Sequence, residues 1–547
     1  MKKILLFTTV CIASVWLSPV KSELIGRPPF IQQYKSDLTE EIAEPLTGEE
    51  KTFLALLDYD NIDRLAQYLT KEIGNRYTST FRRDMAVDWI MAKLKSYDYE
   101  PYIHEFANNR FTHNGCLEVD GKKYIYYGPN YDTETVYQFT NNTVTVSDIA
   151  MFEWPDVSGA FVISDGANVV GKAVIVTLSS VQNSNVARAY VPGVDNYYNA
   201  CLTLQNAGAK AVVFELPAPR NDLNTTYARI PNTTTGTPVT IPVGVTLYDE
   251  THLMLNSLRN AKEIKLTMQT RNDGKNVLAI LPSATGSKKS VYVTAHFDTT
   301  ISGPGMNDNG SGTIMVLEMA RAFKKAKFEY NIIFFFCDAE EAGLRGAHAY
   351  CMDMTDEERE NFVADYNMDM IATSQEDCIH FFLNINDTTD ANTSRLKAIQ
   401  NSLENDQRLI KVPEAFALAR QRDVFNHTYL AAQKLKFDMN CFNICWDTTT
   451  DHWAFIQEAT RAGNDFPNMM NAVEYDWRRN EKGTSFEALY HKAGDTYETN
   501  FLGIAPQGFP SLAPAPVPGL GLERIKTVGE MVSLAIFFSA KGSMLNK

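Results

Sequence analysis

Apolar residues recur at helical spacing in the first part of the chain. Two series follow this spacing: Ile62, Leu65, Leu69 and Ile73, and then Ala86, Ile90 and Leu94. Because residues three and four apart share one face of a helix, each series predicts an amphipathic helix. Gly74 is expected to end the first helix, and Asp84 lies near the start of the second. Residues 102–106 and 116–119 alternate between apolar and polar residues, which predicts two short strands.

The pattern changes between residues 130 and 272, where short β-like runs alternate with turns. The runs cover residues 159–164, 171–177, 209–214 and 239–244, and a helix is expected over 198–207. The stretch 217–237 is rich in Asn, Thr and Pro, which is typical of an exposed loop. This segment therefore predicts a small β-rich domain.

From residue 276 onwards, strand patterns alternate with a helical pattern. Strands are expected over residues 276–281, 290–295 and 331–336, and a helix over 311–325. The run 331–336 is apolar on both faces, as a central strand covered by helices must be. These elements predict an α/β fold.

The composition is that of an ordinary globular protein. Of the 547 residues, 44% are hydrophobic and 21% are charged, which excludes collagen, global disorder and a simple coiled coil. The net charge is −15 and no basic block runs along the chain. We therefore expect neither a nucleic-acid partner nor an anionic membrane partner.

The N-terminus has the pattern of a secretory signal peptide. Lys2 and Lys3 precede an apolar run, 4–17, and Val20 and Ser22 are placed as the small residues of a cleavage site. Residues 1–22 are thus predicted to be removed. No later stretch reaches 18 apolar residues, so no membrane span is expected. The predicted location is secreted, in a secretory or lysosomal lumen, or periplasmic in a bacterial source.

Cysteine is too sparse for a disulfide scaffold. Seven cysteines remain after the signal peptide, and Cys441 and Cys445 are close enough in sequence to form one local bridge. Glycosylation sequons lie at Asn141, Asn224, Asn232, Asn386, Asn392 and Asn426, and fit a glycosylated surface if the host is eukaryotic. A further sequon at Asn309 lies in the motif described next, and we expect it to stay unmodified.

Side chains that bind metals gather where the predicted strands end. The segments are His296-Phe-Asp298, Gly305-Met-Asn-Asp308-Asn-Gly-Ser-Gly312, Asp338-Ala-Glu340-Glu341, Asn367-Met-Asp369 and the later His491. Alternate residues of an extended chain point to the same side, so Asp298 either orients His296 or shares its site. The glycines of the second segment let the backbone approach a ligand closely.

Two imidazoles and three carboxylates suit a pair of Zn²⁺ ions with one bridging carboxylate. Of the adjacent Glu340 and Glu341, one can bind metal while the other acts as a general base. A two-metal site activates water and polarises a substrate carbonyl. Each segment alone is typical of surface polarity, but the whole set in this order predicts a metal hydrolase.

Together the five segments resemble the M28 family of co-catalytic zinc exopeptidases, and the resemblance extends over most of the mature chain. Residues 130–272 are similar to the protease-associated (PA) domain that many members carry as an insert. The resemblance implies a mixed, mostly parallel sheet flanked by helices, built from residues 23–125 and 275–547, with the PA domain between the two parts.

The resemblance also implies a role for each residue. His296 and Asp369 would bind one zinc, Glu341 and His491 the other, and Asp308 would bridge the two ions. Glu340 would be the general base, and Asp298 would orient His296. The segment Cys441-Phe-Asn-Ile-Cys445 resembles a small disulfide loop beside the substrate pocket of some relatives; two reduced, buried cysteines are the alternative.

The acidity of the predicted site favours an aminopeptidase acting on peptide substrates. Four converging carboxylates would hold a free ammonium and repel a free carboxylate. A carboxypeptidase or dipeptidase of the same family is the closer alternative; it would need a cation for the substrate's carboxylate, and the positions of Arg345, Arg420 and Arg422 do not follow from the sequence. A glutaminyl cyclase would use one zinc and needs no PA insert, and a non-catalytic receptor would have lost ligands.

Overall fold

The computed structural model describes most of the chain after residue 43. The described residues are 44–130, 138, 142–155, 159–178, 196–215, 236–246, 263–301, 303–375, 381–384, 423–437, 442–445, 449–463, 465–475, 487–505 and 515–544. Contacts divide the chain into residues 1–42 and 43–547, so every described residue lies in the second unit. The predicted signal peptide, Cys378 and Cys441, and the sequons other than Asn309 and Asn426, lie outside the described residues.

A mixed β-sheet forms the centre of the fold. Seven of its described strands come after residue 263 in the sequence, and the first of them extends beyond the central sheet. These are β8 (Ile264–Leu281), β9 (Ser290–His296), β11 (Asn331–Cys337), β12 (Phe362–Met368), β13 (Phe381–Asn384), β14 (Phe442–Cys445) and β15 (Ala472–Tyr475). Their order is β14-β13-β15-β12-β9-β11-β8. The pairs β12–β15, β12–β9, β9–β11 and β13–β14 are parallel, whereas β13–β15 and β8–β11 are antiparallel. The predicted mixed, mostly parallel sheet is confirmed.

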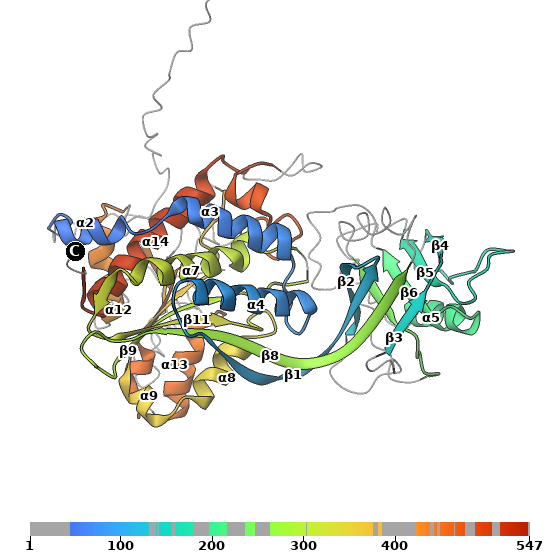
Figure 1. Ribbon diagram of the computed structural model, residues 1–547, viewed down its shortest axis with the longest axis horizontal. Helices are drawn as coiled ribbons and strands as arrows, with labels where there is room; N and C mark the ends of the chain where they lie inside the picture. The colour runs from blue at the N-terminus through green and yellow to red at the C-terminus, as the bar shows by residue number, and fades with distance from the viewer. Residues whose placement is uncertain are drawn as a thin grey trace, which may run out of the picture. The chain divides into compact units, whose positions relative to one another are not determined.

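Helices cover both faces of this sheet (Figure 1). On one face lie α3 (Tyr59–Gln67), α4 (Phe81–Ser96), α7 (Ser311–Phe323) and α14 (Leu520–Ser539); on the other lie α8 (Arg345–Asp353), α9 (Asp356–Asn361) and α13 (His452–Arg461). Successive side chains of β11 serve the two layers. Phe335 packs into the core with Tyr350 of α8, and Phe334 contacts the ring of Phe323 of α7. The sequence therefore had to be apolar on both faces here.

The two helices predicted near the N-terminus from apolar periodicity are confirmed. The buried positions of the first series continue from α3 into η1 (Tyr68–Ile73), and Gly74 ends it with a φ of 73°. Thr80 caps α4 by accepting a hydrogen bond from the Arg83 backbone N–H. Shorter elements complete this part: α2 (Gly48–Leu54), α12 (Asp423–Lys434), η4 (Met306–Gly310), η6 (Pro467–Met470), η7 (Tyr497–Phe501) and the antiparallel pair β10 (Ala326–Phe328) and β16 (Gly542–Met544).

Two long strands connect the central sheet with a second group of strands. β1 (Tyr102–Val119) pairs with β8 in antiparallel fashion, and the register shifts between Ala107 and Thr112. The further elements are β2 (Lys122–Asn130), β3 (Asn142–Val146), β4 (Ile149–Trp154), β5 (Ala173–Leu178), α5 (Asn196–Asn206), β6 (Ala211–Glu215) and β7 (Val243–Thr246). These strands and α5 share a hydrophobic core of their own, whose members run from Leu117 to Met268. The domain boundaries at 130 and 272 stay predictions.

Two strand predictions were wrong in detail. The expected short strands at 102–106 and 116–119 are parts of one strand, β1. Residues 159–164 form no strand. Phe161 there is buried against Phe152 and Trp154, so its side chain packs into the core although its backbone joins no sheet.

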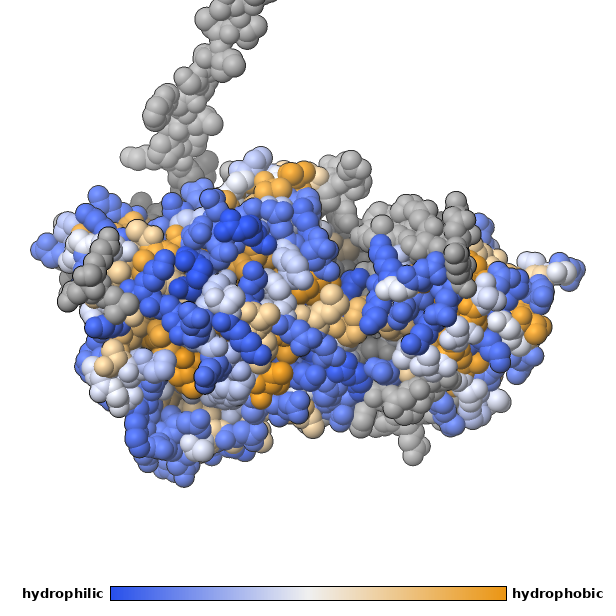
Figure 2. Space-filling model, in the orientation of Figure 1, coloured by the Kyte–Doolittle hydropathy of each residue, from blue (hydrophilic) through white to orange (hydrophobic). Residues whose placement is uncertain are grey.

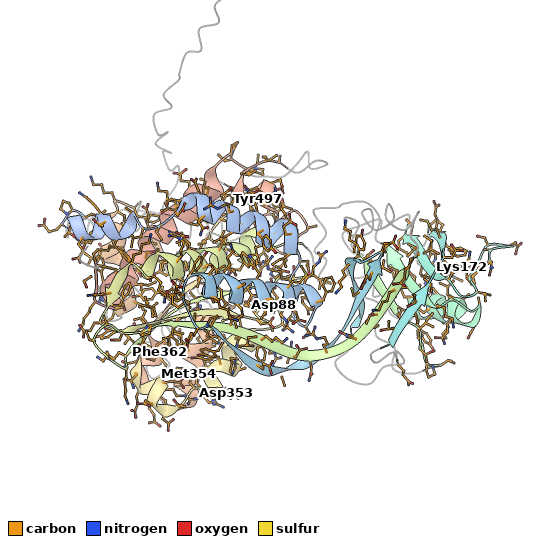
Figure 3. All side chains as sticks on the ribbon, in the orientation of Figure 1. Asp88, Lys172, Asp353, Met354, Phe362 and Tyr497 are labelled. Carbon is orange, nitrogen blue, oxygen red and sulfur yellow. The ribbon has the colours of Figure 1, made fainter. Side chains whose placement is uncertain are left out.

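The described surface agrees with the composition. In the view of Figure 2, hydrophilic residues cover most of the described surface and hydrophobic residues form scattered patches. Met354 and Phe362, labelled in Figure 3, are buried in the core beside α8 and α13. Asn309 is fully buried, in line with an unmodified sequon. No helix in the described part of the chain combines the length and the apolar character that crossing a bilayer requires.

Candidate metal centre

Three neighbouring parallel strands deliver the predicted site residues to one edge of the sheet. β9 lies between β12 and β11, and all three run in the same direction. His296 is the last residue of β9, Glu340 and Glu341 follow β11 in a turn, and Asp369 directly follows β12. Because the carboxyl ends of parallel strands meet at one edge, residues 73 positions apart in sequence come into contact there.

The turn that carries Asp308 depends on close backbone packing. Gly305 has a φ of +54°, and a Cβ there would lie 2.3 Å from the Asp308 carbonyl oxygen. A Cβ on Gly312 would lie 2.2 Å from the carbonyl oxygen of Met368 at the end of β12. The Asn309 side chain donates to that same carbonyl oxygen at 2.8 Å. The glycines therefore let the Asp308 turn sit directly against the end of β12.

Two groups of ligand-type atoms share Asp308. In the first group, His296 Nε2 lies 3.4 Å from Asp308 Oδ1 and 3.3 Å from Asp369 Oδ1. In the second, His491 Nε2 lies 3.1 Å from Asp308 Oδ2 and 3.2 Å from Glu341 Oε2. Within each group one ligand atom per residue lies within 4.8 Å of the others. The two oxygens of Asp308 thus face two different histidines.

Glu340 and Asp298 flank these groups in different ways. Glu340 Oε2 lies 3.9 Å from His296 Nε2, on the side where the ligand atoms converge. Asp298 Oδ1 lies 3.5 Å from His296 Nδ1, and its two oxygens accept the backbone N–H groups of Glu340 and Glu341 at 3.1 and 3.3 Å. Asp298 therefore contacts the outer nitrogen of His296 and also fixes the turn after β11, so it does not join either ligand group.

Burial and mutual charge shape the protonation of the site. Burial raises the pKa of both Glu340 and Glu341 well above its ordinary value; the nearby Asp369 adds to the rise at Glu340, and Asp308 adds to it at Glu341. Burial would lower the pKa of His296, but Glu340 and Asp369 outweigh this effect and raise it. Burial would raise the pKa of Asp308, yet hydrogen bonds from both histidines lower it. So much converging negative charge calls for cations.

The chemistry of the donor set fits zinc. Imidazole nitrogens and carboxylate oxygens are the ligands of catalytic zinc sites, and three protein ligands for each ion leave positions open for water and substrate. Glu341 Oε1 is buried and accepts no hydrogen bond among the described residues, which suits an oxygen that binds a metal. His296, Asp308 and Asp369 would hold one ion, and Asp308, Glu341 and His491 the other.

All seven predicted site residues lie together, and the structure adds one that the sequence gave no role. Asp495 is buried; its Oδ1 accepts the backbone N–H of Asn307 at 2.7 Å and its Oδ2 that of Asp308 at 2.9 Å. Asp495 thereby joins the loop of His491 to the turn of Asp308. Its position four residues after His491 was the only signal in the sequence. Arg420, Arg422 and Cys441 lie outside the described residues. The bridge between Cys441 and Cys445 therefore stays a prediction.

The chain is similar to known peptidases in sequence. Residues 276–502 match peptidase family M28. Aminopeptidase YwaD of Bacillus subtilis is 34% identical over 189 residues, which cover 34% of this chain and 40% of YwaD. The probable lipoprotein aminopeptidase LpqL of Mycobacterium tuberculosis is 34% identical over 140 residues, covering 25% of this chain and 27% of LpqL. The matched segments thus span less than half the length of these relatives.

Solved structures match over a larger share of the chain but less closely. The zinc aminopeptidase BSAP from Bacillus subtilis has a TM-score of 0.47 at 20% identity, covering 88% of this chain and 95% of that one. A glutaminyl cyclase from Bacteroides thetaiotaomicron has a TM-score of 0.40 at 12% identity, covering 88% of this chain and 98% of that one.

Proposed function

We propose that the protein is a two-zinc aminopeptidase that releases single residues from peptide N-termini, and the match of residues 276–502 to peptidase family M28 supports this. One observation carries the proposal: Asp308 is shared by two ligand groups, His296–Asp308–Asp369 and Asp308–Glu341–His491, with Glu340 beside the first. The similar proteins YwaD and LpqL are named aminopeptidases, which agrees with it.

The chain's own residues would divide the work of hydrolysis. Zinc held by the two groups supplies Lewis acidity, which polarises a carbonyl and acidifies a water molecule. Glu340 faces the same space and would take a proton from the attacking water and return it to the departing amine. Asp298 would keep His296 oriented through its Nδ1, and Asp308 would hold the two halves of the site at a fixed separation.

The charge of the site supports recognition of an N-terminus. Asp308, Glu340, Glu341 and Asp369 contribute four carboxylates within one buried space, and the only basic groups among the predicted site residues are two histidines. A substrate carboxylate would find no arginine or lysine among these residues, whereas a substrate ammonium can pair with a carboxylate oxygen. Arg345, one of three arginines considered as the cation of a carboxypeptidase, donates from its Nε to the Ala342 carbonyl at 3.4 Å.

The experiment uses one hexapeptide in three forms: with both termini free, with an acetylated N-terminus, and with an amidated C-terminus. Zinc-loaded protein should shorten the free and amidated peptides stepwise from the N-terminus and leave the acetylated peptide intact, as followed by mass spectrometry. Glu340→Gln protein, prepared in the same way, is the matched control for contaminating peptidases.

Other results would support the rival activities. Cleavage of the acetylated peptide from a free C-terminus would contradict the proposal in favour of a carboxypeptidase. Loss of ammonia from a peptide that begins with glutamine, without chain shortening, would favour a glutaminyl cyclase.

We further propose that the protein is secreted and that residues 130–272 are a PA-type insert. Secretion rests on the signal-peptide pattern of residues 1–22, and glycosylation on the sequons outside the ligand segments, three before His296 and three between Asp369 and His491. N-terminal sequencing of protein from the culture medium should give a first residue near Glu23. Retention of Met1 in extracellular protein would contradict the predicted cleavage.

A further inference from the structure

Two fully buried arginines lie behind the candidate metal centre: Arg76 in the loop between η1 and α4, and Arg83 in the first turn of α4. Arg76 and Arg83 are among the largest fully buried side chains of the described residues, and both are 0% exposed. Both arginines precede residues 276–502, the part that matches the peptidase family. Burying a guanidinium is costly unless its hydrogen bonds and charge are satisfied, so each arginine should have a specific task.

Arg76 contacts the backbone of both turns that carry ligands of the first group. Its Nε donates to the Phe297 carbonyl at 2.7 Å, next to His296. Its Nη1 donates to the Pro304 carbonyl at 2.6 Å and its Nη2 to the Gly305 carbonyl at 3.2 Å, at the start of the Asp308 turn. The backbone N–H of Arg76 also donates to Thr299 Oγ1 at 2.9 Å. One side chain thus ties together the two ends of the 297–305 loop.

The positive charge of Arg76 is balanced by carboxylates that do not contact it directly. Among the described residues no carboxylate forms an ion pair with Arg76, and its four side-chain hydrogen bonds all go to carbonyl oxygens. Burial lowers its pKa to about 10, against the opposing effect of Asp298, Asp495 and Asp308. The acidic residues around the site are therefore the counter-charge of this buried cation.

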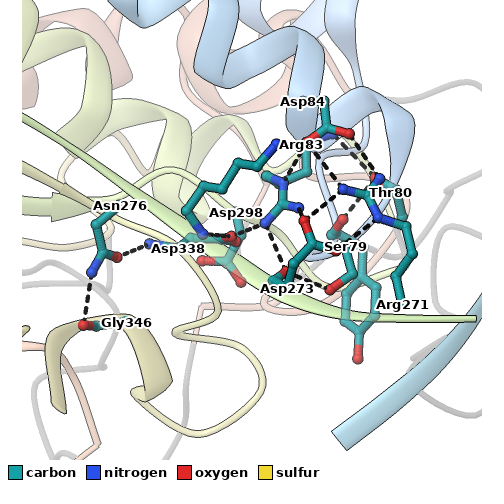
Figure 4. Close-up of polar contacts among 12 residues, drawn as sticks. Ser79, Thr80, Arg83, Asp84, Arg271, Asp273, Asn276, Asp298, Asp338 and Gly346 are labelled. Atoms are coloured by element: carbon teal, nitrogen blue, oxygen red, sulfur yellow. Dashed lines mark hydrogen bonds and ion pairs between the residues drawn. The ribbon is translucent and has the colours of Figure 1, made fainter. Parts of the chain in front are cut away.

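Arg83 fixes the turn after β11. Figure 4 shows its guanidinium between Asp84, Asp273 and Asp338, with Asp298 close to Asp338. Asp338 is fully buried; its Oδ2 accepts from Arg83 Nη1 and from the backbone N–H of Lys275 at 2.8 Å. Asp338 lies two residues before Glu340, whose backbone N–H is held by Asp298. The turn of Glu340 and Glu341 is thus anchored at both ends.

We propose that residues 75–84 are a positioning element of the metal centre, in which Arg76 sets the His296 and Asp308 turns and Arg83 sets the turn of Glu340 and Glu341. The inference deepens the proposed function. It rests on that function only where the test measures kcat and KM, and not where it measures zinc affinity. Neither arginine contacts a candidate ligand side chain, so both act through the backbone turns and through Asp338.

The test compares Arg76→Met, Arg76→Lys and Arg83→Met with the wild type, and Arg321→Met serves as the matched control. Arg321 pairs with the buried Glu318 on α7 and donates to the Leu56 carbonyl, away from the site residues. Zinc affinity is measured by competition with a chromophoric chelator, kcat and KM on leucine p-nitroanilide, and folding by circular dichroism and Tm.

Arg76→Met should weaken zinc binding by about 10- to 100-fold, the usual effect of losing a residue that supports metal ligands. Arg76→Lys should restore little of it, because an ammonium cannot span three carbonyls as the planar guanidinium does. Arg83→Met should also weaken zinc binding, because Glu341 lies in the turn that Arg83 sets. In zinc-saturated protein it should lower kcat by about 100-fold through Glu340, as a small displacement of a catalytic group does. Arg321→Met should lower Tm and change neither zinc affinity nor kcat.

The inference is overturned if folded Arg76→Met and Arg83→Met proteins keep wild-type zinc affinity and kcat. It is also overturned if Arg321→Met lowers zinc affinity and kcat as much as these two variants do. Should Arg76→Met not fold, Arg76→Lys carries the same test. Should Arg83→Met not fold, the double variant Arg83→Met/Asp338→Asn replaces it, because it removes both buried charges. A wild type that binds zinc but cleaves no peptide would contradict the proposed function alone, and zinc affinity would still test Arg76.

Discussion

At the scale of single residues, two adjacent glutamates take different positions in the candidate metal centre. Glu341 Oε2 lies 3.2 Å from His491 Nε2, in the second ligand group, whereas Glu340 Oε2 lies 3.9 Å from His296 Nε2 and belongs to neither group. The backbone N–H groups of both are held by the carboxylate of Asp298. One turn thus presents two carboxylates in different directions. Substitution of Glu340 should therefore lower kcat, and substitution of Glu341 should lower the zinc content.

Glu340→Gln should lower kcat by about 10²–10⁴-fold, the usual contribution of general acid–base catalysis. The amide keeps the size of the side chain but cannot take a proton from water, so zinc content should stay near that of the wild type. The measurement pairs steady-state kinetics on leucine p-nitroanilide with zinc analysis of the same sample. Near-normal turnover would remove Glu340 as the general base.

Glu341→Gln should act on the metal instead. Losing one carboxylate ligand from the Asp308–Glu341–His491 group should reduce zinc per chain after dialysis, and added Zn²⁺ should restore part of the activity. Zinc analysis before and after dialysis checks this, with Glu340→Gln as the matched control. An unchanged zinc content would show that Glu341 is not a ligand.

The candidate ligand residues other than His491 were predictable because they follow a strand pattern or lie in a glycine turn, whereas His491 lies in a loop and was assigned through the family resemblance. His296, Glu340 and Asp369 follow apolar runs that became β9, β11 and β12. Arg76 and Arg83 were not predictable, because apolar periodicity assigns an arginine to the surface. Their burial depends on carbonyl groups and carboxylates more than 180 residues further along the chain, such as Phe297 and Asp273.

At the scale of elements, a network of ion pairs joins α4 to β8 beside the point where β8 leaves the central sheet. Asp84 of α4 pairs with Arg271 of β8 at 2.7 Å, and Asp273 of β8 pairs with Arg83 at 2.7 Å. Asp273 lies opposite the irregularity in β1, where the register shifts after Ala107. The network therefore joins helix and strand where the backbone pairing is interrupted.

This network should make folding stability depend on pH in the acid range. Burial would raise the pKa of Asp273, but hydrogen bonds from Arg271 and the charges of Arg83 and Arg271 lower it to about 2 from 3.8. A lowered pKa means that the stabilisation is present above about pH 4 and is lost as the pH falls toward 2. Asp273→Asn should thus cost about 1 kcal/mol above pH 4, since the group is part-exposed, and little at pH 2.

Urea unfolding at pH 7, 4, 3 and 2 measures this difference. Asp88→Asn on the exposed side of α4 (labelled in Figure 3) is the control, and its stability should stay parallel to that of the wild type. A constant difference between Asp273→Asn and the wild type from pH 7 to pH 2 would contradict the assignment.

The element predictions were good where one period dominated the sequence. Helices α3, α4 and α7 and strands β9 and β11 follow the apolar pattern closely. The length of β1 was not predictable, because the break in its apolar pattern between Phe106 and Cys116 gives no sign that the two ends pair with one partner, β8. The sequence of residues 159–164 has the apolar pattern of a strand because Phe161 packs into the core. The backbone of Phe161 nevertheless pairs with no strand.

At the scale of the whole molecule, the part that carries the candidate metal centre is assembled from two separated stretches of chain. β1 pairs with β8 on the edge of the central sheet, and α4 covers the same face as α7. Tyr99 donates a hydrogen bond to the Ala320 carbonyl at 2.7 Å, and Asp58 and Asn61 both donate to Glu318. The N-terminal stretch is therefore part of the same core as the metal centre.

A protein consisting of residues 275–547 alone should be insoluble or inactive. It would lack Arg76 and Arg83, and it would expose the apolar face of α7 and the edge of β8. Expression of this fragment beside the full mature chain, with zinc analysis and peptidase assay, tests the prediction. A stable, active fragment would show that the two stretches are independent.

The central claim is that one chain holds two zinc ions on either side of Asp308. Anomalous diffraction at the zinc absorption edge, from crystals of the zinc-loaded protein, tests it most directly. We predict two peaks, one bounded by His296, Asp308 and Asp369 and the other by Asp308, Glu341 and His491, separated by roughly 3.5–4 Å as in other two-metal sites. A single peak, or peaks that do not contact Asp308, would contradict the account.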